Sequence, residues 1–178
     1  MGRLRWLIVP VAVVPVAWLL VQGIGRDPRD IPTPLAGEPM PAFALVDLDG
    51  NRVESDALRG RPIVLNFWAS WCAPCVAEHA VLADAAQQYG DEVAIVGVLY
   101  QDEPGAALDF LARYGDYGWP SLIDEGGRLA IEFGVTGPPE TFFIDASGIV
   151  RTRELGPVTD DVLAAELEPL VAAAEAAR

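Results

Sequence analysis

Two cysteines, Cys72 and Cys75, are the only cysteines of the 178-residue chain, and two residues separate them. Such a pair can bridge only to itself, so the chain has no framework of structural disulfides. A disulfide that closes so short a loop stabilises a fold little. A tetrahedral zinc site needs four ligands, and His79, the one histidine, would supply a poor third. The pair therefore indicates thiol–disulfide redox chemistry.

The elements around the pair favour the same chemistry. A nearly continuous apolar run over residues 62–68 predicts a buried strand, and residues 73–89 predict a helix that the cysteines open. At such a junction, free N–H groups and the positive end of the helix dipole stabilise a thiolate. We expect Cys72 to be exposed at the mouth of the helix with a lowered pKa, and Cys75 to lie about one turn in and sheltered. Cys72 then attacks a substrate disulfide, and Cys75 resolves the mixed disulfide.

The remaining chain predicts an α/β domain with a central mixed sheet, because strand and helix patterns alternate. Residues 146–148 form the turn of a predicted hairpin, and Thr159 is the predicted N-cap of the last helix. The other predicted strands are 43–47, a short one at 53, 93–100, 141–145 and 149–154, and the helical segments are 56–59, 104–114, 129–133 and 159–176.

Residues 1–25 predict a transmembrane signal-anchor. No residue between Arg5 and Arg26 is charged, and a helix of this length crosses the ~30 Å hydrocarbon core of a bilayer. Arg3 and Arg5 precede the span, which places the N-terminus in the cytoplasm and the domain outside it. A cleaved signal peptide is the alternative, with the weak cleavage site Gly23-Ile24-Gly25.

The positions of the prolines predict the linker and the domain bounds, and the net charge bears on the class of partner. Five prolines between residues 26 and 41 predict a stiff, extended linker over 26–35, followed by the domain over 36–178. The net charge is −14, and all twelve basic residues are arginine. An acidic surface repels phosphate backbones, so we expect no nucleic-acid partner.

The active-site segment 67–75, Phe-Trp-Ala-Ser-Trp-Cys-Ala-Pro-Cys, resembles that of the thioredoxin superfamily. Two further strings match one branch more sharply. They are Cys-Val-Ala-Glu-His at 75–79 and Gly-Val-Thr-Gly-Pro-Pro-Glu-Thr-Phe-Phe-Ile-Asp at 134–145. Both look like the thiol:disulfide interchange proteins of cytochrome c maturation, the TlpA-like DsbE/CcmG type. The resemblance runs over residues 37–169, together with the N-terminal anchor.

This resemblance implies a thioredoxin-like fold preceded by one transmembrane helix. It also implies a single-pass protein of the inner membrane, with its catalytic domain on the periplasmic side. Such a reductant uses no cofactor. It receives electrons from a transmembrane thiol carrier and passes them to apocytochrome c, or to a haem-ligation partner that holds it.

The resemblance also implies residue roles. Cys72 and Cys75 are the catalytic, redox-active pair, and Trp71, Pro139, Glu140 and Glu78 form their environment. Pro139 matches the cis-proline position, where a cis bond lets a substrate strand pair beside the cysteines. An ordinary trans Pro-Pro turn is the alternative.

Asn66 departs from ordinary thioredoxins, which carry a buried Asp on this strand. Because an Asn cannot accept a proton, another group must assist Cys75. A desolvated carboxylate with a raised pKa would do so, and we expect Glu140, beside the substrate loop, somewhat more than Glu78, three residues after Cys75. The alternative for Glu78 is a solvated helix residue. We expect His79 on the surface or facing a partner.

Other functions remain open at this stage. A general extracytoplasmic thiol reductase would use the same pair. A peroxide-reducing redoxin is a further alternative, but a peroxidatic cysteine normally relies on a different local environment from a Cys-x-x-Cys pair. A tethered chaperone that binds soft metals through its thiols belongs to a different class. The string at 134–141 favours the cytochrome c maturation reductase.

Overall fold

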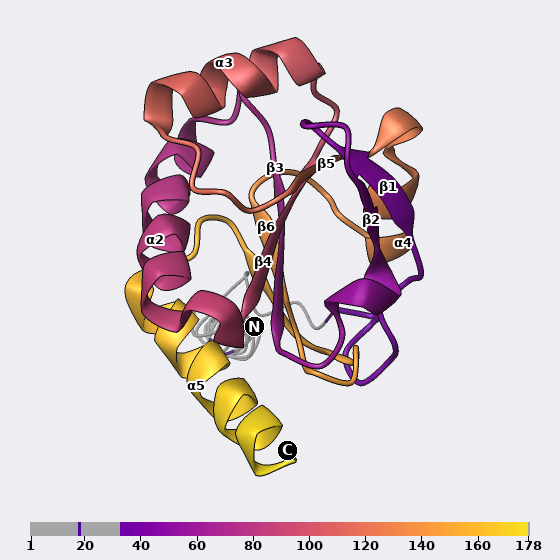
Figure 1. Cartoon of the computed structure of the whole chain (residues 1–178), viewed down its shortest axis with the longest axis vertical. Helices are drawn as coiled ribbons and strands as arrows, with labels where there is room; N and C mark the ends of the chain where they lie inside the picture. The colour runs from indigo at the N-terminus through magenta and orange to yellow at the C-terminus, as the bar shows by residue number, and fades with distance from the viewer. Residues whose placement is uncertain (1–17, 19–32, 178) are drawn as a thin grey trace, which may run out of the picture. The chain divides into compact units, whose positions relative to one another are not determined.

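The computed structural model describes Trp18 and residues 33–177. A seven-stranded mixed sheet runs through the domain in the order β2-β1-β5-β4-β3-β6-β7 (Figure 1). Strands β3, β4 and β5 are parallel, and the other pairs are antiparallel. The strands are β1 Ala44–Asp47, β2 Arg52–Glu54, β3 Ile63–Trp68, β4 Ala94–Leu99, β5 Ser121–Ile123, β6 Glu140–Ile144 and β7 Val150–Leu155.

Strand β3 leads into the cysteine pair from the interior of the sheet. All six of its residues are buried, which explains the continuous apolar run. Side chains alternate across the sheet: Leu65 and Phe67 pack into one core cluster, and Val64 and Trp68 point to clusters on the other face. The end of β3 is therefore held on both sides.

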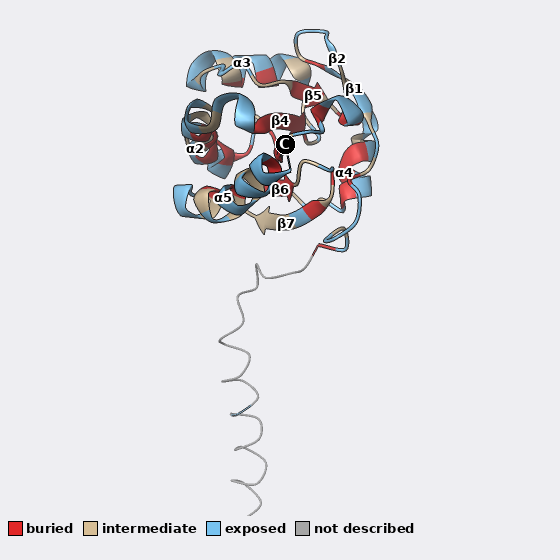
Figure 2. Ribbon diagram, turned by 60° about the horizontal axis from the view of Figure 1, so that its bottom comes forward, coloured by how far each residue is buried: buried red, intermediate tan, exposed pale blue. Residues whose placement is uncertain are grey.

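Helices cover both faces of this sheet. In Figure 2, α2, α3 and α5 lie on one side, and α4 lies on the other. The helices are α2 Ala73–Tyr89, α3 Pro104–Tyr114, α4 Arg128–Phe133 and α5 Asp160–Ala176, with short 3₁₀ turns η1 Ser55–Leu58, η2 Gly90–Glu92 and η3 Glu125–Gly127.

Local signals set the helix ends. Pro104 occupies the first turn of α3, where its missing N–H leaves no hydrogen bond unmade. Gly115 ends that helix with φ 111°, a conformation that side chains rarely adopt. The Thr159 hydroxyl accepts a hydrogen bond from the Val162 N–H, which confirms it as the N-cap of α5.

The predicted helices over 73–89 and 104–114 agree with α2 and α3. The prediction lacked β5, and it placed the first helical turn at 56–59 instead of Ser55–Leu58. Strand β5 has three residues and follows Pro120, so it is too short to show a period of two. Its pairing with β1 and β4 creates it.

The domain is a compact unit over Pro32–Arg178. The predicted anchor, residues 1–25, lies outside the described residues except for Trp18. Among the residues that the structure does describe, no helix has the length and apolar character to cross a membrane.

Candidate active site

Cys72 and Cys75 form a disulfide at the junction of β3 and α2, with their Cα atoms 5.4 Å apart. Cys72 is the N-cap of α2, and Pro74 lies in the first turn. The backbone N–H of Cys75 donates to Cys72 Sγ over 3.2 Å. This sulfur takes the place of a capping oxygen, so the positive end of the helix faces it.

The expectation that Cys72 is exposed is wrong for the disulfide form. Cys72 is 4% exposed and Cys75 is 2% exposed. Both pack in a cluster with Trp68 and Phe110. The disulfide holds the Cys72 sulfur 3.2 Å from the Cys75 N–H, at the start of the helix.

We predict that Cys72 reacts first once the disulfide is reduced. The helix N-terminus stabilises its thiolate, while Cys75 stays inside the first turn. Iodoacetamide labelling of the reduced protein at pH 6, followed by peptide mass mapping, should show the label on Cys72. Preferential labelling of Cys75 would reverse the roles of the two thiols.

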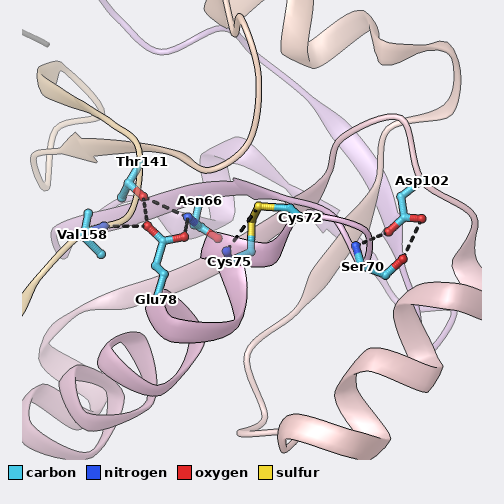
Figure 3. Close-up of a disulfide and its surroundings, with 8 residues drawn as sticks. All are labelled: Asn66, Ser70, Cys72, Cys75, Glu78, Asp102, Thr141 and Val158. Carbon is cyan, nitrogen blue, oxygen red and sulfur yellow. Dashed lines mark hydrogen bonds between the residues drawn. A yellow bond between two sulfur atoms is a disulfide. The ribbon is translucent and has the colours of Figure 1, made fainter. Parts of the chain in front are cut away.

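Glu78 is buried beneath the disulfide in a polar network (Figure 3). Its Oε2 accepts from Asn66 Nδ2 at 2.8 Å, and its Oε1 accepts from the Val158 N–H at 2.9 Å. Thr141 Oγ1 lies 3.4 Å from the same Oε1 and accepts from Asn66 Nδ2 at 2.9 Å. The solvated-helix alternative for Glu78 is therefore wrong, because the side chain is 1% exposed.

Burial raises the pKa of Glu78 from 4.5 to about 7, against the lowering effect of hydrogen bonds from Val158, Asn66 and Thr141. The nearby charge of Glu154 adds to the increase. Glu78 and Cys75 also line one cavity of about 10 Å³, roughly the room for a single water molecule. A carboxyl group that titrates near neutral pH thus lies beside the second thiol.

Asn66 has a role that its sequence position alone does not reveal. Its amide donates both to Glu78 and to the Thr141 hydroxyl, so it orients the carboxylate. Strand pairing places Asn66 opposite Thr141. The acid is supplied by the helix, and the strand supplies the amide that holds it.

Glu140 is buried and engaged by the loop that precedes it. Its Oε1 accepts from the Thr136 N–H at 2.6 Å, the Thr136 hydroxyl at 2.5 Å and the Gly137 N–H at 3.1 Å. Its Oε2 lies 3.5 Å from the buried Arg153 guanidinium. Three loop donors and a guanidinium therefore surround the Glu140 carboxylate, whereas the Glu78 carboxyl group lines the same cavity as Cys75. The choice of Glu140 over Glu78 as the base stays a prediction.

The Pro138-Pro139 peptide bond is cis, so the trans alternative is wrong. The Pro139 carbonyl accepts from the Gly156 N–H at 2.9 Å, which ties the loop to the end of β7. Trp71, the residue directly before Cys72, is 58% exposed.

His79 is buried, contrary to expectation, at 7% exposed. Its Nε2 lies 2.7 Å from the Gly115 carbonyl oxygen, and its ring packs against Trp119 and Tyr117 with centroids 5.2 and 5.3 Å away. The residue spacing could have predicted the burial of His79, because positions 75, 78, 79 and 82 share one helical face. Polar residues on this buried face indicate a site.

The comparisons with known proteins agree with this geometry. The Redoxin family model matches residues 35–168. The chain is 42% identical over 168 residues to the thiol:disulfide interchange protein DsbE of Allochromatium vinosum, covering 93% of this chain and 92% of that protein. It is 42% identical over 149 residues to the thiol:disulfide interchange protein HelX of Rhodobacter capsulatus, covering 83% of each.

A crystal structure of a thiol:disulfide interchange protein DsbE from Chlorobium tepidum superposes with a TM-score of 0.68 and 31% identity, over 78% of this chain and 96% of that one. The fold is thus thioredoxin-like, and the Cys72–Cys75 pair is the disulfide of a thiol–disulfide oxidoreductase. The chain belongs to the Redoxin family and, within it, to the DsbE thiol:disulfide interchange proteins.

Proposed function

We propose that this oxidoreductase is a membrane-tethered, extracytoplasmic reductant of apocytochrome c disulfides in cytochrome c maturation. The observation that carries the reductase chemistry is the Cys72–Cys75 disulfide at the N-terminus of α2, where the buried Glu78 carboxyl group lines the same cavity as Cys75. This carboxyl group, with its pKa of about 7, suits a pair that must release protons near neutral pH. The DsbE/CcmG pattern at residues 134–145 supports the choice of substrate.

In the first step, the Cys72 thiolate attacks one sulfur of the substrate disulfide. The substrate S–S bond breaks, a Cys72–substrate disulfide forms, and the other substrate sulfur leaves as a thiolate that water protonates. The N-terminus of α2 stabilises the attacking thiolate. The cis-Pro139 loop supports pairing with the substrate backbone.

In the second step, Cys75 gives its thiol proton to the Glu78 carboxylate, directly or through a water in the shared cavity. The Cys75 thiolate attacks the Cys72 sulfur, the mixed disulfide breaks, and the second substrate sulfur leaves as a thiolate. Two electrons have passed to the substrate. The enzyme pair is now the disulfide, and a donor thiol must reduce it before the next turnover.

The donor in this proposal is a transmembrane thiol carrier, and residues 1–25 anchor the chain in the cytoplasmic membrane with the catalytic domain outside. In an oxidising compartment the pair stays reduced only while electrons arrive across the membrane. The apolar stretch between Arg5 and Arg26 supports the anchor.

A Cys75→Ser variant tests the substrate. Without Cys75 the mixed disulfide on Cys72 cannot be resolved, so substrates stay covalently attached. We expect proteins with a Cys-x-x-Cys-His haem site, or a haem-ligation partner, among those released by dithiothreitol and identified by mass spectrometry. The Cys72→Ser variant is the matched control and should trap none of them.

A general extracytoplasmic thiol reductase is the second candidate, since the Cys pair and Glu78 would serve any exposed disulfide. Capture of many unrelated proteins, with normal c-type cytochrome levels after gene deletion, would favour it and contradict the first proposal.

A further inference from the structure

The loop between β4 and α3, residues 100–103, is attached to the segment just before the cysteines. Asp102 Oδ2 accepts from the Ser70 N–H at 2.5 Å, and Asp102 Oδ1 accepts from the Ser70 hydroxyl at 3.0 Å (Figure 3). The Glu103 N–H donates to the same Oδ1 at 2.9 Å. One carboxylate therefore bridges the active-site segment and the start of α3.

The neighbouring residue holds Trp71. The Gln101 carbonyl accepts a hydrogen bond from the Trp71 indole Nε1–H at 3.2 Å. Gln101 has φ 47° and is the one non-glycine residue with positive φ in the described part of the chain. Such a conformation persists only where its surroundings impose it. The two hydrogen bonds between Ser70 and Asp102, the residue after Gln101, supply that constraint.

The Trp71 side chain is thus held in place and is still exposed to solvent. Its single polar atom is bonded to Gln101, while the side chain is 58% exposed. A rigid exposed aromatic ring loses little conformational entropy when it binds an apolar partner. Trp71 also directly precedes Cys72, so a polypeptide that brings a disulfide to Cys72 must pass close to it.

We propose that Asp102 is a positioning residue, which holds Trp71 as a docking surface for the polypeptide that flanks the substrate disulfide. The inference rests on the proposed reductase function of Cys72. Figure 3 shows the disulfide between two polar networks, with Glu78 on one side and the Ser70–Asp102 pair on the other. The Glu78 network acts on the proton of Cys75, and the Asp102 network acts on the approach of the substrate.

The docked partner is an unfolded polypeptide segment with apolar side chains next to its cysteines. A small disulfide such as hydroxyethyl disulfide has no side chains to place on an indole. The ratio of the rate constants for a peptide and for this small disulfide therefore isolates docking from thiol chemistry.

The experiment uses the reduced full-length protein and stopped-flow measurement of both rate constants. The peptide probe contains an oxidised Cys-x-x-Cys-His motif with apolar flanking residues. In Asp102→Ala, we expect the ratio of peptide to small-disulfide rate constants to fall about tenfold, the loss typical of one charge-assisted hydrogen bond. Asp102→Asn, which keeps an acceptor for Ser70, should recover part of the ratio.

Two further variants sharpen the test. Trp71→Ala should lower the ratio as much as Asp102→Ala, and the double variant should lower it no further, because both act through one docking surface. Asp109→Ala removes an exposed acid from α3 and controls for the change in charge. It should leave the ratio unchanged.

NMR gives a readout that follows the position of Trp71. Its indole N–H, assigned by its loss in Trp71→Phe, should exchange faster with solvent in Asp102→Ala. Equal losses on both substrates, or an unchanged ratio in Asp102→Ala, would overturn the inference. A wild-type protein that reduces neither probe would instead refute the proposed reductase function, and with it the docking role.

Discussion

Glu78→Gln should slow resolution of the Cys72–substrate disulfide by about 10²-fold at pH 7, the lower end of what a general base contributes. The glutamine keeps the size of the side chain and an acceptor for Val158, but it cannot take the Cys75 proton. The first attack by Cys72 does not need that proton acceptor. Rapid acid quench, followed by alkylation and mass analysis of the trapped species, measures the two steps separately.

The pH profile gives this prediction its sharpest form. In the wild type, the resolution rate should rise with the ionised fraction of Glu78 and flatten above its pKa of about 7. In Glu78→Gln this inflection should be absent, and the rate should rise with the ionisation of Cys75 itself. Glu175→Gln, an exposed position on α5, is the matched control. An unchanged inflection in Glu78→Gln would show that another group accepts the proton.

The same pKa shift links Glu78 to stability. Its pKa is raised in the folded state, so the native protein keeps a proton that the unfolded chain releases above pH 4.5. The stability from this group is fully present below pH 4.5 and is lost as the pH rises through about 7. This pKa shift corresponds to a contribution of about 3 kcal/mol to the free energy of unfolding. Urea denaturation of the oxidised protein across this range should show the decline in the wild type and a flatter profile in Glu78→Gln.

Glu140→Ala should lower the free energy of unfolding by about 3–5 kcal/mol, the cost of removing one partner of a buried ion pair. Glu140 is 1% and Arg153 5% exposed, so the substitution removes one carboxylate partner from a buried guanidinium. The Thr136 and Gly137 N–H groups would also lose their acceptor. Urea denaturation at pH 7, with the disulfide intact, measures the change.

An exposed ion pair in the same domain supplies the control. Glu132 pairs with Arg128 one helical turn away, and their side chains are 35% and 87% exposed. Glu132→Ala should cost no more than about 0.5 kcal/mol, because surface pairs contribute little. A Glu140→Ala variant no less stable than Glu132→Ala would contradict the structural role assigned to Glu140.

The sequence by itself determined the local features of this protein. Cys72 and Cys75 stand between an apolar run and a helix, and both elements follow from side-chain periodicity over short windows. Pro104 and Thr159 marked helix starts, because capping depends on neighbours a few residues away. The family pattern then indicated which residues surround the pair.

Only the tertiary structure decided which of these residues share the buried site. Glu78 becomes a neutral-pH acid because folding buries it, although Asn66 and Thr141, on adjacent strands, and Val158, 80 residues away, donate hydrogen bonds that lower its pKa. Its raised pKa comes from desolvation, which depends on the packing of α2 and α5 on the sheet. Glu140, an equally buried carboxylate, instead meets three loop donors and a guanidinium. Two glutamates of equal intrinsic acidity therefore lie in different surroundings. Folding places Glu140 beside a guanidinium, and it gives Glu78 hydrogen-bond donors that do not offset its burial.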